Sequence, residues 1–333
     1  MIISRTPVRV SFFGGGTDYR EYYERESGAV LGTTINKYIY VSLNELSDFF
    51  EYKIRVAYSK SELVNSIADI VHPSVRECLK FMNIDGNLDI HIFSDLPAKT
   101  GLGSSSAFSA GFLHCLYAMK GKLVSKQQLA AEVRYIEQQM IHENVGSQDQ
   151  YHTSFGGLNI IEFNRERVLV RPVVISREKR DLLEKSTMVF YTGLSRFASE
   201  VVKEQIDNTK SRSKDSCLKR MGQMVFEAEK IISDISIDQM MKKLGELLHE
   251  GWELKKTLSG KISNSSINDM YSKALEAGAY GGKISGAGAG GFLMLFVDPA
   301  CQKEVRRALS NFLELECRFE DEGSQIIYLK NVR

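Results

Sequence analysis

Runs of β-branched and aromatic residues, and alternation of apolar with polar positions, predict strands early in the chain. Residues 2–13 (IISRTPVRVSFF), 30–43 and 52–58 are rich in such residues. Residues 88–92 alternate apolar with polar side chains, which is typical of a strand with one buried face. We expect these segments to build an antiparallel sheet.

Helical spacing of apolar residues predicts helices between and after these strands. Residues 61–82 follow this spacing with Pro73 as an interruption, and residues 107–119 are apolar nearly all round, as in a buried helix. Ser125 and Gln128 form a capping box at the start of a further helix. The later part of the chain predicts strands at 158–163, 168–175, 187–192, 293–297 and 324–329, and helices within 197–258, over 267–277 and from Asp298 with Pro299 through Phe312.

A glycine- and serine-rich loop, TGLGSSSAF (100–108), joins the strand at 88–92 to the buried helix. Gly101 and Gly103 can take positive φ, and Ser104–Ser106 fall where unpaired N–H groups and the helix dipole attract anions. The loop is therefore either a phosphate cradle or a serine-capped helix start. It is not a Walker A loop, it lacks the third glycine of the dinucleotide fingerprint, and the protein-kinase motifs are absent.

Two further glycine-rich loops follow predicted strands or helices, at 14–16 and within 281–292 (GGKISGAGAGGF). The first leaves Asp18 as the first charged side chain beyond three glycines, and the alternative is a flexible turn with a solvated aspartate. Glycine costs backbone entropy and is kept where ligands need close approach, so three such loops are hard to explain as turns.

Two carboxylates between these loops are candidates for chemistry. Glu137 lies beside the core face of the helix that starts at Ser125, and is either a surface charge or an inward ligand for a cation. Asp149 lies among small and amide side chains (GSQDQ), where it is either a turn residue or a functional acid.

Composition narrows the class of protein. The 43 Lys and Arg balance 42 Asp and Glu, and a net charge of +1 gives no footprint of nucleic-acid or membrane binding. The 5 cysteines are scattered without a Cys-x-x-Cys pair, which indicates reduced thiols of a cytoplasmic protein. We see neither a membrane-spanning apolar run nor a signal peptide. A length of 333 residues favours two domains.

The segments 5–19, 96–108 and 281–292 resemble, in order, the three motifs of GHMP kinases, which phosphorylate sugars, homoserine and mevalonate with ATP. The resemblance implies an α+β, two-domain GHMP kinase fold, with a ribosomal protein S5 domain 2-like N-terminal domain and a ferredoxin-like C-terminal domain. We place these domains at 1–180 and 181–333, with the active site between them.

The resemblance also implies roles for individual residues. Asp149 matches the family's catalytic aspartate, and Arg9 matches the arginine beside it. Asp18 matches the sugar-binding aspartate, and Glu137 with Ser105 matches the pair that contacts Mg²⁺. The residues expected to bind ATP are Lys99, Gly101, Leu102, Gly103, Ser104, Ser105, Ser106, Gly286 and Gly288.

Substrate choice is suggested by narrower phrases, FFGGGTDY (12–19), TINKYIYV (34–41) and YTGLSRFASEV (191–201). They resemble the branch of the family that phosphorylates the anomeric C1 hydroxyl of D-glycero-D-manno-heptose 7-phosphate for surface polysaccharide. Galactokinases read Gly-Glu-His-Thr-Asp where this chain reads GGGTD, which argues against galactose and opens space at Gly15 and Gly16 for a bulkier acceptor. Arg196, then Lys37 and Arg20, are candidates for the 7-phosphate.

Two other functions stay open. Another GHMP sugar 1-kinase, acting on fucose or an unphosphorylated hexose or heptose, would need no second phosphate pocket. A non-catalytic sensor of sugar and nucleotide should have lost a catalytic group, yet Arg9, Ser105, Glu137 and Asp149 are all present. We expect ATP and a sugar phosphate as the partners of a cytoplasmic monomer or homodimer.

Overall fold

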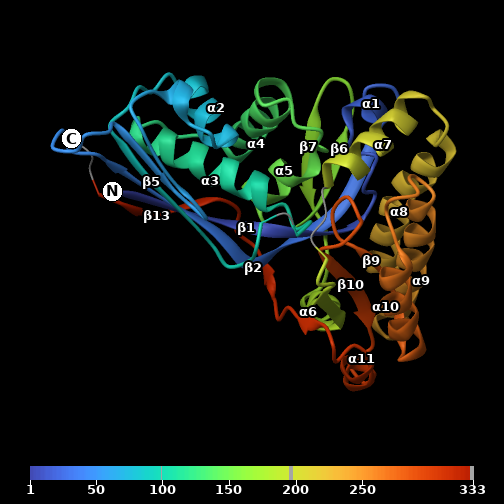
Figure 1. Ribbon diagram of the computed structural model, residues 1–333. Helices are drawn as coiled ribbons and strands as arrows, with labels where there is room; N and C mark the ends of the chain where they lie inside the picture. The colour runs from blue at the N-terminus through green and yellow to red at the C-terminus, as the bar shows by residue number, and fades with distance from the viewer. Residues whose placement is uncertain (99, 195–197, 331–333) are drawn as a thin grey trace.

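The computed structural model describes residues 1–98, 100–194 and 198–330, and these build two sheets with helices packed against them (Figure 1). The first sheet follows the order β13-β1-β2-β5-β3-β4, and β2 also pairs with β6 and β12. Its strands are β1 (Ile2–Phe13), β2 (Gly28–Glu45), β3 (Ile54–Ala57), β4 (Ser61–Val64), β5 (Leu88–Ser94), β6 (Leu158–Phe163), β7 (Val168–Pro172), β12 (Phe319–Glu320) and β13 (Gln325–Leu329).

Helices cover one face of this sheet (Figure 1). They are α2 (Pro73–Met82), α3 (Ser104–Met119), α4 (Lys126–Tyr135), continued by a π-helical turn at Ile136–Met140, and α5 (Gln148–Phe155). Helix α3 lies across β1 and β2, and it is buried over most of its length, as its apolar sequence predicts. A short helix, α1 (Arg20–Tyr23), and a 3₁₀ turn at Ile67–Asp69 complete this half.

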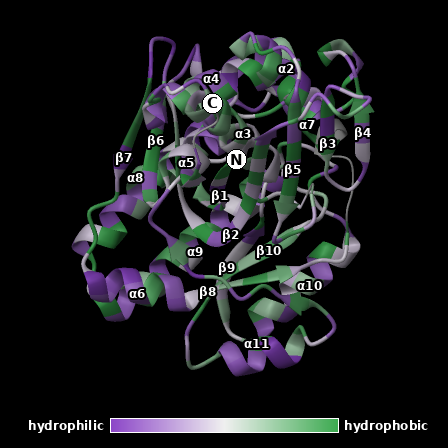
Figure 2. Cartoon of the chain, turned by 90° about the vertical axis from the view of Figure 1, so that its left-hand side faces the viewer, coloured by the Kyte–Doolittle hydropathy of each residue, from purple (hydrophilic) through white to green (hydrophobic). Residues whose placement is uncertain are grey.

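The second sheet follows the order β11-β8-β10-β9, with β8 (Thr187–Tyr191), β9 (Ala279–Ile284), β10 (Phe292–Val297) and β11 (Leu313–Glu314). Its helices are α6 (Arg177–Ser186), α7 (Ala198–Lys210), α8 (Asp215–Asp234), α9 (Ile237–Lys256), α10 (Ser265–Glu276) and α11 (Gln302–Ala308). Strand β10 is buried along its whole length, and Figure 2 shows it in hydrophobic colours, whereas α11 at the periphery is largely hydrophilic.

Three details differ from the sequence-based expectations. Residues 61–82 are not one helix: Ser61–Val64 pairs with β3 in a hairpin, and the helix begins at Pro73, which suits a first helical position because proline lacks an N–H. Strand β3 runs parallel to β5, not antiparallel. Asp298 caps a turn by accepting from the N–H of Ala300, so the next helix starts later, at Gln302.

The boundary between the expected domains stays a prediction. The second sheet begins just after residue 180, with β8 at Thr187–Tyr191. The last strands return to the first sheet, since β12 pairs with β2 and β13 pairs with β1. The chain therefore crosses between the two sheets twice.

Candidate active site

A cavity of about 470 Å³ lies where the three glycine-rich loops meet, between the two sheets. Residues from β1, α7, α9 and the loops around 142–149 complete its wall. The lining residues are Arg9, Ser11, Gly15, Gly16, Asp18, Tyr19, Gly101, Gly103, His142, Glu143, Asn144, Val145, Gly146, Gln148, Asp149, Val202, Gln205, Lys255, Lys283, Gly286 and Ala287.

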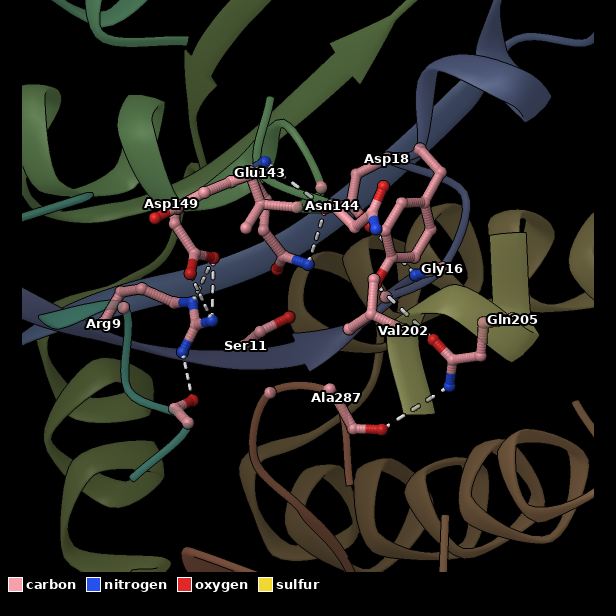
Figure 3. A pocket seen from close by; sticks show the side chains of 18 of the residues that line it. Arg9, Ser11, Gly16, Asp18, Glu143, Asn144, Asp149, Val202, Gln205 and Ala287 are labelled. Carbon is pink, nitrogen blue, oxygen red and sulfur yellow. Dashed lines mark hydrogen bonds and ion pairs between the residues drawn. The ribbon is translucent and has the colours of Figure 1, made fainter. Parts of the chain in front are cut away.

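Arg9 and Asp149 form a two-bond ion pair in the wall of this cavity (Figure 3). Arg9 donates from Nε to Oδ1 and from Nη2 to Oδ2 of Asp149, both over 2.8 Å, and from Nη1 to the carbonyl oxygen of Gly101 over 2.6 Å. The arginine is buried, whereas the side chain of Asp149 is 26% exposed. The pair therefore presents an oriented carboxylate to the cavity, beside the phosphate-loop candidate.

The loop at 101–103 is fitted closely to this pair. Gly103 caps the start of α3 with φ of 77°, a conformation that favours glycine. A Cβ on Gly103 would lie 3.2 Å from Cγ of Arg9 and 3.3 Å from Oδ2 of Asp149. The carbonyl of the buried Leu102 accepts from the N–H of Arg9 over 2.9 Å. These contacts aim the N-terminus of α3, a site suited to anions, at the cavity that holds the Asp149 carboxylate.

Asp18 is buried on the other side of the cavity, as Figure 3 shows. Its carboxylate accepts from the N–H of Gly16 over 2.9 Å and from Nε2 of Gln148 over 3.0 Å. Burial raises the pKa of Asp18, and these hydrogen bonds oppose the rise. A side chain at Gly146 would overlap the carboxylate, so the loop before α5 packs directly on it.

Glu137 lies in the π-helical turn, fully buried and outside the residues that line the cavity. Its Oε2 accepts from Oγ of Ser106 over 2.9 Å and from Nε2 of Gln150 over 2.6 Å. Burial raises the pKa of Glu137 to about 7, although the Gln150 bond opposes this. The serine bonded to Glu137 is thus Ser106, whereas Ser105 is exposed at the start of α3.

Glu137 has one feature that suits a cation. Its Oε1 is buried and has no hydrogen-bond partner among the described residues. Across the same residues, no group of three or more His, Cys, Asp or Glu forms a metal cage. Mg²⁺ typically takes only one or two carboxylates from a protein together with substrate phosphates, and a carboxylate beside serine hydroxyls fits that chemistry.

Two buried lysines in the cavity wall were not singled out from the sequence. Lys255 on α9 is 5% exposed and donates to the carbonyl oxygen of Gly286, and burial lowers its pKa to about 8. Lys283 on β9 is 6% exposed and donates to the carbonyl oxygen of Phe12 over 3.2 Å. Lys283 stands inside the third glycine-rich motif, where a charged residue among glycines was the available signal.

Of the other predicted site residues, some line the cavity and some do not. Gly286 lines the cavity, whereas Gly288 does not, and a Cβ on Gly288 would lie 2.8 Å from the carbonyl oxygen of Ile262. The role of Gly288 in ATP binding stays a prediction. Lys37 on β2 and Arg20 on α1 do not line the cavity, and Arg20 donates to Glu24 over 2.6 Å. Lys99 and Arg196 lie outside the described residues.

The fold and the cavity define the class of the protein. An aspartate held by an arginine and a helix N-terminus beside the same space are parts that a phosphotransferase needs for positioning and for charge neutralisation. Among the described residues, no helix combines the length and the apolar character needed to cross a bilayer. This arrangement suits a kinase whose small-molecule substrate binds in the cavity.

Comparison with known proteins identifies the family. The model of the GHMP kinase N-terminal domain matches residues 63–157, and that of the GHMP kinase C-terminal domain matches residues 236–315. D-glycero-alpha-D-manno-heptose 7-phosphate kinase of Campylobacter jejuni is 29% identical over 328 residues, which cover 92% of this chain and 93% of the relative. Galactokinase of Pyrococcus furiosus is 24% identical over 336 residues, 92% of each chain.

Solved structures agree in fold. The crystal structure of a D-glycero-D-manno-heptose 1-phosphate kinase from Bacteroides thetaiotaomicron matches with a TM-score of 0.79 at 24% identity, covering 99% of this chain and 100% of that one. The chain belongs to the GHMP kinase family. The predicted two-domain GHMP kinase fold and the predicted enzyme class, an ATP-dependent sugar kinase, are confirmed.

Proposed function

We propose that this protein transfers the γ-phosphoryl group of ATP to the C1 hydroxyl of D-glycero-D-manno-heptose 7-phosphate, giving the 1,7-bisphosphate and ADP. The Arg9–Asp149 pair in the cavity wall, beside the N-terminus of α3, carries the proposal. The similarity to a heptose 7-phosphate kinase over most of both chains supports the choice of acceptor. The absence of Glu and His side chains at Gly15 and Gly16 leaves room for it.

In this mechanism the ATP phosphates lie against the loop at 101–103 and the first N–H groups of α3. Asp149 accepts the proton of the C1 hydroxyl, and the C1 oxygen then attacks the γ-phosphorus as ADP leaves. Arg9 orients Asp149 through its two hydrogen bonds. Asp18 binds sugar hydroxyls on the opposite side of the cavity.

Glu137 and Ser105 are the residues we propose to hold Mg²⁺, with Ser106 orienting Glu137 through its hydrogen bond. When bound, this ion neutralises charge on the β- and γ-phosphates. We further propose a cytoplasmic enzyme of activated-heptose synthesis, acting as a monomer or homodimer.

The test is ADP release with Mg²⁺ and ATP across a panel of acceptors: heptose 7-phosphate, the unphosphorylated heptose, mannose, fucose, galactose and mevalonate. We expect turnover to be confined to heptose 7-phosphate. Turnover of an unphosphorylated sugar would instead indicate a different sugar 1-kinase. No turnover with any acceptor would favour the non-catalytic sensor.

A further inference from the structure

Lys283 has a buried side-chain amine with no anionic partner among the described residues. Its side-chain nitrogen donates to the carbonyl oxygen of Phe12, and within the described part of the chain it forms no ion pair with a carboxylate. An ammonium group has three N–H donors, so this bond leaves two unused. Buried charges in proteins are normally paired, because desolvation otherwise disfavours them. A cation that faces a cavity in this state fits an anionic ligand.

Two more polar groups converge on the same space, beside Gly15. An ideal Cβ on Gly15 would lie 3.8 Å from Nζ of Lys283, 3.8 Å from Nε2 of Gln148 and 4.0 Å from Oγ of Ser11. Ser11 is 3% exposed, and its Oγ has no hydrogen-bond partner among the described residues. Nε2 of Gln148 donates one hydrogen to Asp18 and keeps a second.

These three groups border the space beside Gly15. An anion that lies in this space can accept hydrogen bonds from the ammonium, amide and hydroxyl groups around it. No side chain occupies the space, because residue 15 is glycine and its Cβ would meet nothing nearer than 3.8 Å. We call Lys283, Ser11 and Gln148, with the space beside Gly15, the Gly15 cradle.

The cradle lies on the acceptor side of the cavity. In Figure 3, Ser11 stands between the Arg9–Asp149 pair and the side that holds Gly16 and Asp18. Lys255 bonds the carbonyl oxygen of Gly286, and a Cβ on Gly286 would lie 2.7 Å from Cα of Gly101. Lys255 is therefore tied to the loops around 101 and 286, whereas Lys283 is tied to the carbonyl of Phe12 on β1.

We propose that the Gly15 cradle binds the phosphate that the acceptor already carries, and so selects a phosphorylated sugar. This inference rests on the proposed function, because an unphosphorylated acceptor would leave the cradle without a ligand. Burial lowers the pKa of Lys283 well below its ordinary value, and the neighbouring Lys255 and Arg9 lower it further while Asp18 raises it. A bound phosphate restores the charged form of Lys283.

The experiment compares heptose 7-phosphate with unphosphorylated heptose as acceptors. In wild type we expect kcat/KM to favour the phosphorylated sugar. Lys283→Met should reduce that preference about 100-fold, through a higher KM for heptose 7-phosphate, since charge-assisted hydrogen bonds to phosphate are lost. The KM for ATP and kcat/KM for the unphosphorylated heptose should stay within about 3-fold. Lys273→Met, a change at an exposed lysine of α10, is the matched control.

A second variant fills the cradle instead of removing its cation. Gly15→Glu would place a carboxylate near Lys283, at a position where a Cβ meets no atom nearer than 3.8 Å. We expect kcat/KM to fall more for the phosphorylated acceptor than for the unphosphorylated one.

The outcomes separate this inference from the proposed function. If wild type shows no preference for the phosphorylated sugar, the proposed substrate and the cradle are both wrong. If wild type shows the preference and both variants retain it, the cradle is wrong and the proposed function stands. If Lys283→Met raises the KM for ATP and weakens both acceptors equally, Lys283 serves the nucleotide and the inference is overturned.

Discussion

Asp149 and Glu137 are two carboxylates proposed for the same reaction, but their surroundings differ. Asp149 is 26% exposed in the cavity wall and is held by two hydrogen bonds from Arg9. Glu137 is fully buried, and its Oε2 accepts from Ser106 and Gln150, while its Oε1 has no hydrogen-bond partner in the described part of the chain. Asp149 is paired with a positive charge, whereas the hydrogen-bond partners of Glu137 are neutral and the nearby Glu143 raises its pKa further.

The difference shows how two helical segments close together in sequence support two kinds of acid. A carboxylate that must take a proton from a substrate needs access to the cavity and a fixed direction, which a guanidinium supplies. A carboxylate that must bind a cation can be buried away from water, because the charge of the bound cation offsets the desolvation of the carboxylate. Substitutions that remove one environment at a time test this distinction.

The largest effect is expected for Asp149→Asn. An amide accepts no proton from the C1 hydroxyl, so turnover should fall by about 10³-fold, within the range typical of general-base removal. Steady-state ADP release measures the loss, and calorimetry should show ATP binding unchanged within about 3-fold. Asp269→Asn, at an exposed i,i+4 pair with Lys273, is the control. Near-normal turnover of Asp149→Asn would contradict the assignment.

An effect on stability is expected for Glu137→Gln in the protein without Mg²⁺. The folded-state pKa of Glu137, about 7, exceeds its ordinary value of 4.5, so the buried group is favoured in its protonated form. Its contribution to stability is fully present below pH 4.5 and is lost as pH rises to 7. Between pH 4.5 and pH 7 the free energy of unfolding of wild type should therefore fall by about 3 kcal/mol relative to that of Glu137→Gln.

Urea unfolding of wild type and of Glu137→Gln, at a series of pH values, measures this difference. A difference that does not change with pH would show that Glu137 is not a desolvated carboxylate. In activity assays the variant should need at least about 10-fold more Mg²⁺ for half-maximal rate, as loss of a charged ligand predicts. An unchanged Mg²⁺ requirement would exclude Glu137 as a metal ligand.

The smallest effect is expected on stability when Ser105 and Ser106 are each replaced by alanine. Ser106→Ala removes a buried donor to Glu137 and should cost about 1 kcal/mol of unfolding free energy. Ser105→Ala changes an exposed position, and its stability should stay within about 0.5 kcal/mol of wild type. Ser105→Ala should raise the Mg²⁺ requirement if this serine contacts the metal. If the Ser105 variant proves the less stable of the two, the arrangement around Glu137 is wrong.

Elements with strong local signals could be predicted from the sequence. The strand at 2–13, the apolar helix α3 and the glycine-rich loops appear where expected, because their patterns are set by residues close together in the chain. The prediction of one helix over 61–82 was wrong, because some of these apolar residues belong to the β3–β4 hairpin. The spacing of apolar residues alone does not reveal that pairing. The parallel pairing of β3 with β5 likewise depends on contacts distant in sequence.

The residues of the candidate site also fall into two groups, those that the sequence could select and those that only the structure reveals. Arg9, Asp18 and Asp149 could be selected because each stands in or near a motif, and the structure brings them to one cavity. Lys255 could not, because it is one of many lysines in a long helical region and only burial makes it unusual. The role of Ser106 was not interpretable before its bond to Glu137 was seen.

The pairing of β13 with β1 has a consequence for how the protein is made. Ile2 lies opposite Leu329, so the ribosome must synthesise the whole second sheet before this edge of the first sheet can close. The first sheet therefore cannot complete its folding before the second sheet has been synthesised. Until β13 arrives, β1 exposes an unpaired edge that invites pairing with other chains. A chaperone that shields nascent β-structure is expected to raise the yield of this enzyme more than that of proteins whose domains are contiguous in sequence.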